Sequence, residues 1–166
     1  MSFVFPLKTI GRLFQICEVT MSNPIIYDKA KFHLEGNFPA ELERIQAFIH
    51  TGFYLGWLCK RSLTSGEFNE DFEPEIAEFR DGTLTAPNLY RISGGVLADD
   101  MLDKLGNEFT EVYFDLSHGQ FLRDYQEVFG PGLRTMYHVR DTWENFSSIE
   151  KRLDMRFNEW LNRRNT

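Results

Sequence analysis

The chain has 166 residues, of which 42% are hydrophobic and 15% aromatic, so it can build one folded core and is too apolar for intrinsic disorder. Its formal net charge of −7 disfavours binding to nucleic acid or to an anionic membrane, because the long-range field repels phosphate groups. We therefore expect a partner with a basic surface, no nucleic acid and no membrane.

The first residues are expected to stand apart from the main fold. Lys8 and Arg12 interrupt the apolar residues near the N-terminus, which is the wrong order of charges for a secretory signal. We expect residues 1–22 to form a peripheral extension and residues 23–166 to form a single domain. A cytoplasmic location follows from this reasoning as an expectation.

The longest expected helix covers residues 39–61, where apolar side chains recur near a period of 3.6 residues. Acidic residues fall in its first turn and Lys60 and Arg61 in its last, which suits the helix dipole. Gly52 and Gly56 share one face, and each costs about 1 kcal/mol of helix propensity. We therefore expect another backbone to approach this face closely.

Shorter helices are expected to follow. Residues 65–82 form an amphipathic pattern with an acidic back, in which Pro74 is expected to separate the first turn. Further helices are predicted within 85–95, at 109–116 and 121–129, and in the last segment, 141–164, where Ser147 and Glu150 have capping-box spacing. The sequence thus predicts an all-α domain of five to six helices, with at most a short extended segment near 135–139.

The sequence contains no pattern of known chemistry. Its four histidines have no metal-ligand spacing, and the chain lacks the serine elbow and glycine-rich loops of hydrolases and nucleotide-binding proteins. His50 and Cys59 are nine residues apart and point to opposite sides of a helix, which argues against a catalytic pair between them. We expect no catalytic residue, no metal and no cofactor, and both cysteines, Cys17 and Cys59, as free thiols.

Several aromatic residues fall outside the best apolar stripes. Such residues are more often part of a core than of a binding surface. If they are exposed together, they form a contact patch beside the acidic surface, which is typical of protein-binding faces. The residues concerned are Tyr54, Trp57, Phe114 and Trp143.

Five sequence blocks carry a family resemblance. They are YDKAKFHLEGNFP (27–39), FIHTGFYLGWL (48–58), LADDML (97–102), YFDLSHGQFLRDY (113–125) and YHVRDTWENF (137–146). In order and spacing these blocks resemble a family of small bacterial proteins, which is in turn similar to immunity proteins of polymorphic and type VI toxin systems. The resemblance implies a cytoplasmic antidote that binds a toxin, and it supplies no catalytic residue.

Charge and resemblance together favour a non-enzymatic immunity protein that neutralises a cognate toxin through an acidic surface containing aromatic residues. A helical adaptor for another bacterial protein is an alternative. A small enzyme that uses His33, His50 or His138 with carboxylates in a cleft between helices is another. The residues expected to bind the toxin are Glu67, Glu70, Asp71, Glu73, Asp99, Asp100 and Trp143.

Overall fold

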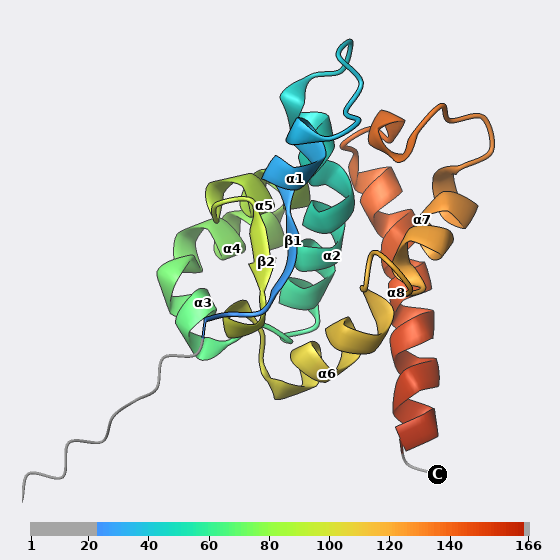
Figure 1. Cartoon of the computed structure of the whole chain (residues 1–166). Coiled ribbons are helices and arrows are strands. Elements are labelled where there is room, and N and C mark those ends of the chain that lie inside the picture. Colours follow the sequence, from blue (N-terminus) through green and yellow to red (C-terminus); the bar gives the residue numbers. More distant parts are fainter. Residues whose placement is uncertain (1–22, 165–166) are drawn as a thin grey trace, which may run out of the picture.

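The protein is built around one central helix, α2 (Ile49–Lys60), in a computed structural model that describes residues 23–164 (Figure 1). Every residue of α2 from Ile49 to Cys59 is buried. A helix that is enclosed on all sides must carry apolar or small residues around its whole circumference, as this one does. The predicted extension at 1–22 lies outside the described residues.

The other helices surround α2, so the predicted all-α class is confirmed, although eight α-helices are present among the described residues rather than five to six. Three short 3₁₀ helices, η1 (Arg44–Phe48), η2 (Asp99–Met101) and η3 (Met136–His138), connect them. The remaining α-helices are α1 (Ala30–Glu35), α3 (Gly66–Asp71), α4 (Glu73–Asp81), α5 (Ala86–Ile92), α6 (Lys104–Tyr113), α7 (Phe121–Phe129) and α8 (Trp143–Arg164).

The strands β1 (Ile26–Lys29) and β2 (Val96–Ala98) pair to form a small antiparallel sheet beside α2 (Figure 1). The sequence did not predict it, because strands this short contain too few residues to show alternation. The segment expected to be extended, 135–139, instead contains the 3₁₀ turn η3. The extended backbone therefore lies at other positions than those predicted.

The expected close approach to the glycines of α2 is confirmed. A Cβ atom on Gly52 would lie 2.5 Å from the Cα of Pro87, and one on Gly56 would lie 2.5 Å from the Cβ of Ala86. Both neighbours belong to the first turn of α5. The glycines thus allow α5 to pack directly on the backbone of α2.

Helix boundaries agree with the sequence in some places and differ in others. The predicted break near Pro74 is confirmed, because α3 and α4 are separate helices that meet at Phe72. The α-helix expected over 39–61 begins only at Ile49, after the 3₁₀ turn η1. The last helix begins at Trp143, so Ser147 lies inside it and does not cap it.

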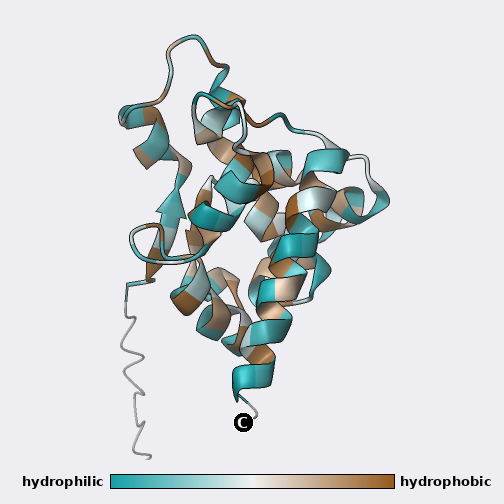
Figure 2. Ribbon diagram, turned by 90° about the vertical axis from the view of Figure 1, so that its right-hand side faces the viewer, coloured by the Kyte–Doolittle hydropathy of each residue, from teal (hydrophilic) through white to brown (hydrophobic). Residues whose placement is uncertain are grey.

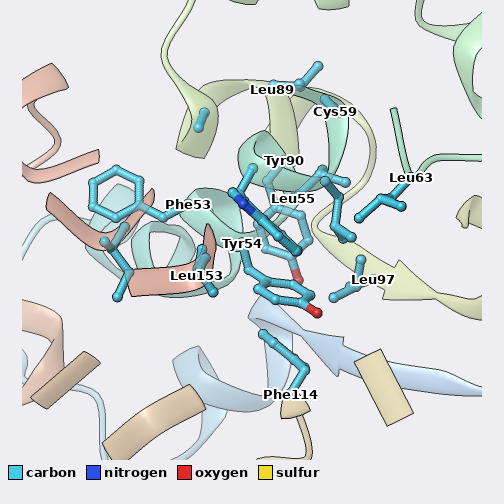
Figure 3. Packing of buried hydrophobic residues seen from close by; sticks show 14 of the residues in the cluster. Phe53, Tyr54, Leu55, Cys59, Leu63, Leu89, Tyr90, Leu97, Phe114 and Leu153 are labelled. Atoms are coloured by element: carbon cyan, nitrogen blue, oxygen red, sulfur yellow. The ribbon is translucent and has the colours of Figure 1, made fainter. Parts of the chain in front are cut away.

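The predicted aromatic contact patch is wrong for three of its four residues. Tyr54, Trp57 and Phe114 are completely buried, and Figure 3 shows Tyr54 and Phe114 within the core cluster. For Tyr54 and Trp57 the prediction failed because α2 is buried on all sides, and Phe114, at the end of α6, is covered by Tyr54 and Phe121. Only Trp143 is exposed, at 40%.

Helix α8 is held against α7 by a buried carboxylate. Asp124 of α7 is fully enclosed and accepts hydrogen bonds from Arg152 and Arg156 of α8, at 2.8 to 2.9 Å. It also accepts one from Tyr113, at the end of α6. Figure 2 shows α8 as a long helix of alternating hydrophilic and hydrophobic bands, as expected for a helix with one side in solvent.

Candidate functional site

Five polar side chains gather at the N-terminal end of α2, and we call them the His–Asp cluster: Asp28, His33, His50, Thr51 and Tyr137. They come from β1, α1, the first turn of α2 and η3, which are distant in sequence. Apolar side chains fill most of the protein interior, so a buried polar group of this size is the most distinctive chemical feature among the described residues.

The backbone places these residues as follows. A register irregularity in β1, between Ile26 and Asp28, precedes the buried side chain of Asp28; irregularities of this kind often re-aim a side chain beside a functional site. Helix α1 begins immediately after β1, which puts His33 close to Asp28. The Gln46 side chain donates to the carbonyl oxygens of Tyr137 and Val139 and so fixes the η3 segment in place.

Short contacts connect the ionisable groups. The Nε2 atom of His33 lies 2.8 Å from Oδ1 of Asp28 and 3.1 Å from Nε2 of His50. On its other side, Nδ1 of His33 lies 2.9 Å from the hydroxyl of Tyr137. Thr51 donates to the second carboxylate oxygen of Asp28. His33 is therefore the centre of the cluster.

Burial and charge set the protonation states. Burial lowers the pKa of His50 to about 3, although the Asp28 charge opposes this shift. Burial alone would raise the pKa of Asp28, but the hydrogen bond from His33 and the nearness of His50 outweigh it and the pKa is lowered. At neutral pH the cluster thus contains an uncharged His50 and an ionised Asp28.

The cluster is enclosed except at one point. Asp28 and His50 are 3% and 1% exposed, whereas the side chain of His33 is 15% exposed. Tyr137 is partly exposed and packs its ring against Phe38. His33 and Tyr137 are therefore the members of the cluster that solvent can reach most readily.

The other two histidines, His118 and His138, lie outside the His–Asp cluster. His118 is exposed beside Asp115, and Nδ1 of His138 lies against the hydroxyl of Thr135. Of the histidines named for an enzyme, the structure therefore brings together His33 and His50 and leaves His138 outside the cluster.

Most of the predicted toxin-binding acids form a second feature. Glu67, Asp71 and Asp100 line one shallow hollow of about 150 Å³, whose other lining residues are Phe68, Phe72 and Met101. We call the exposed acids here the acidic face: Glu67, Glu70, Asp71, Glu73 and Asp100.

The acidic face lacks internal counter-ions. Its carboxylates form no ion pair with any residue in 23–164. On α8, by contrast, Asp154 and Glu159 are paired with arginines and Glu150 is paired with Lys60. The negative charge of α3 and η2 therefore remains available to a partner.

Two predicted residues do not belong to the acidic face. Asp99 is only partly exposed, and its carboxylate accepts a hydrogen bond from the backbone N–H of Ile25, which holds the start of β1. Trp143 stacks on Phe79, with ring centroids 5.8 Å apart, toward the other end of α4. The structure thus gives Asp99 a structural contact and places Trp143 apart from the acids.

Comparison with known families places the chain. The family described as a domain of unknown function, DUF7832, matches residues 26–139. The chain belongs to this family. The matched range contains the whole His–Asp cluster and the whole acidic face, and it ends before α8. No curated protein and no solved structure matches the chain.

The helices within residues 23–164 are not suited to cross a membrane, because each is either too short or too polar to span a bilayer.

Sequence reasoning missed Asp28, Thr51 and Tyr137 as members of the His–Asp cluster. The one local sign was the adjacent pair His50 and Thr51 inside an otherwise apolar helix, since buried polar residues require partners. The partners themselves lie on other elements, so no spacing rule along the chain could identify them.

Proposed function

We propose that this protein is a non-enzymatic immunity protein, which binds a cognate bacterial toxin with a basic surface through the acidic face and thereby neutralises it in the cytoplasm. The observation that carries the proposal is the convergence of Glu67, Asp71 and Asp100 around one hollow that is also lined by apolar residues and that has no counter-ion within residues 23–164. The partner's class rests on the sequence resemblance, and the location of the surface rests on the geometry.

Physical reasoning supports such a surface. Carboxylates attract a cationic partner and speed its association, and the hollow offers apolar contacts that slow dissociation. Toxin domains that act on nucleic acid often have basic active sites, and a set of carboxylates can take the place of the phosphates there. The acids stand on short, well-anchored helices: Ser65 caps α3 by accepting from the N–H of Phe68.

The first test is protection of cells. The toxic product of a neighbouring gene is expressed together with either the native protein or the triple variant Glu67→Lys, Asp71→Lys, Asp100→Lys. We expect the native protein to restore growth and bind the toxin, and the variant to lose at least a hundredfold in affinity. Because all three residues are exposed, the variant should keep the native melting temperature.

A matched control separates the location of charge from its amount. The triple variant Glu43→Lys, Glu111→Lys, Glu144→Lys changes the net charge equally at exposed acids outside the acidic face. It should protect cells as well as the native protein does. Equal loss of binding in both triple variants would show that only net charge matters, and unchanged binding in the first would place the toxin elsewhere.

An enzyme is the second candidate, and the His–Asp cluster favours it. His33 contacts both Asp28 and Tyr137, an arrangement that can move a proton. The discriminating result is protection by His33→Asn: an inhibitor that acts by the acidic face keeps it, whereas an enzyme loses it. A helical adaptor is distinguished by gene order, because no toxin gene would accompany it.

A further inference from the structure

We propose that Asp28, His33 and His50 bind one divalent first-row transition-metal ion, with zinc as the expected ion. This site goes beyond the proposed function, because it lies on β1, α1 and α2 and shares no residue with the acidic face. Two imidazoles and one carboxylate are a ligand set for such ions in proteins.

The distances fit a common metal centre. Ligands placed tetrahedrally at about 2.0 to 2.1 Å from a zinc ion are about 3.3 Å from one another. The three separations within the cluster bracket this value: 2.8 Å from His33 Nε2 to Asp28 Oδ1, 3.1 Å between the two Nε2 atoms, and 3.7 Å from His50 Nε2 to Asp28 Oδ2. Because the first and third distances involve different oxygens of Asp28, its carboxylate would turn so that one oxygen shares a centre with both Nε2 atoms; one candidate ligand atom from each residue lies within 4.8 Å of the others.

Without a cation, the protons of the cluster cannot satisfy every atom. If His50 carries its proton on Nδ1, the lone pair on its Nε2 and the Asp28 oxygen compete for the single Nε2–H of His33. If the proton is on Nε2 instead, it points at Nε2 of His33, which then cannot also donate to Asp28. A metal ion would accept the lone pairs of both Nε2 atoms and of a carboxylate oxygen together and so end this competition, with the proton of His50 on Nδ1.

Neighbouring groups are arranged as supports for ligands. With Nε2 of His33 on the metal, its Nδ1–H would donate to the Tyr137 hydroxyl at 2.9 Å. Thr51 already donates to the carboxylate of Asp28 and fixes its orientation. Such outer contacts typically hold metal-binding histidines and carboxylates in place. The partly exposed edge of His33 provides the path of entry.

Metal binding by the whole chain tests the proposal. The protein is freed of metal with a chelator, exposed to Zn²⁺ or Co²⁺, and passed through gel filtration before metal analysis. We expect one equivalent of metal, a higher melting temperature with Zn²⁺, and visible Co²⁺ bands typical of nitrogen and oxygen ligands. His33→Asn and Asp28→Asn should each weaken binding at least tenfold.

The control is His138→Asn, which removes a histidine outside the cluster and should retain the full equivalent. If a cluster variant fails to fold, nitrogen-15 spectra of the native protein decide the question, because Zn²⁺ should shift the Nε2 resonances of two histidines out of four. Absence of retained metal in the native protein would overturn the proposal. So would equal retention by folded His33→Asn, or unmoved histidine resonances.

Discussion

Gly52 faces Pro87 so closely that a Cβ atom added to Gly52 would lie 2.5 Å from the Pro87 Cα. Backbone cannot move aside as a flexible side chain can, so a methyl group there must push α5 away from α2. We expect Gly52→Ala to lower the free energy of unfolding by about 1 to 3 kcal/mol, measured by urea denaturation.

Gly66 provides the matched control for this prediction. It lies in the first turn of α3, and a Cβ atom there would meet nothing within 4 Å. Gly66→Ala should leave stability unchanged or raise it by up to about 1 kcal/mol, because alanine favours the helix. Similar destabilisation by both substitutions would contradict the argument from close contact.

Tyr125 carries a hydroxyl that is buried and has no hydrogen-bond partner among the described residues. Removing an unsatisfied buried group costs no interaction and ends its desolvation penalty. We expect Tyr125→Phe to leave the free energy of unfolding unchanged or to raise it by about 1 kcal/mol. Thermal and urea unfolding measure this change.

Tyr113 is the comparison for Tyr125, because it is also buried but donates its hydroxyl proton to Asp124 at 2.9 Å. Tyr113→Phe removes a hydrogen bond to a charged group and should lower stability by about 1 to 2 kcal/mol. The two substitutions delete the same atom, so a similar loss in both would show that the Tyr125 hydroxyl does have a partner.

Acid should weaken the contact between α7 and α8. Burial alone would raise the pKa of Asp124, but hydrogen bonds from Arg156, Gln120, Tyr113 and Arg152 lower it to about 2. Because the folded-state pKa lies below the unfolded value, the stabilisation is complete above about pH 4 and is lost as the pH falls toward about 2. The expected loss is about 1 to 2 kcal/mol.

The variant Asp124→Asn isolates this effect. Asparagine has no charge to lose, so the difference in unfolding free energy between the native protein and the variant should shrink between about pH 5 and about pH 2. Urea titrations at several pH values measure it. A difference that stays constant over this range would assign the acid sensitivity to other carboxylates.

Cys59 should not react with thiol reagents in the folded protein. It is completely buried, and burial raises the pKa of its thiol to about 12 even though Arg80 acts in the opposite direction. Reaction with thiol reagents requires the thiolate. In a Cys17→Ser background, we expect labelling of Cys59 only under unfolding conditions. Fast, complete labelling in native buffer would contradict the buried position.

Sequence reasoning succeeded where local chemistry decides the structure. The spacing of four apolar residues predicted an amphipathic segment, and Pro74 predicted its division into α3 and α4. These residues are Phe68, Phe72, Ile76 and Phe79. The glycine pair of α2 predicted a close neighbour. These features depend on helix periodicity and backbone sterics, which are readable along the chain.

The features that the sequence did not predict have a different cause, because they depend on how elements distant in sequence pack together. Whether Tyr54 faces solvent depends on how many elements cover α2, and this is a property of the assembled fold. The convergence of Asp28 with His50 depends on a strand and a helix meeting in space. The acids Glu67 and Asp71 were named because of the density of charge along one segment, whereas their proximity to Asp100 could be seen only in the structure.

The hydrogen bonds from Arg152 and Arg156 of α8 to Asp124 help to define the smallest fragment of the protein that can fold on its own. The range matched by DUF7832 ends at 139, yet Phe157 of α8 packs on Trp57 with ring centroids 5.5 Å apart. A fragment that ends at residue 139 would lack the side chain of Phe157 that covers Trp57. Asp124 would also lose its hydrogen bonds from Arg152 and Arg156. We therefore expect an autonomously folding unit to extend through α8, beyond the range that the family match covers.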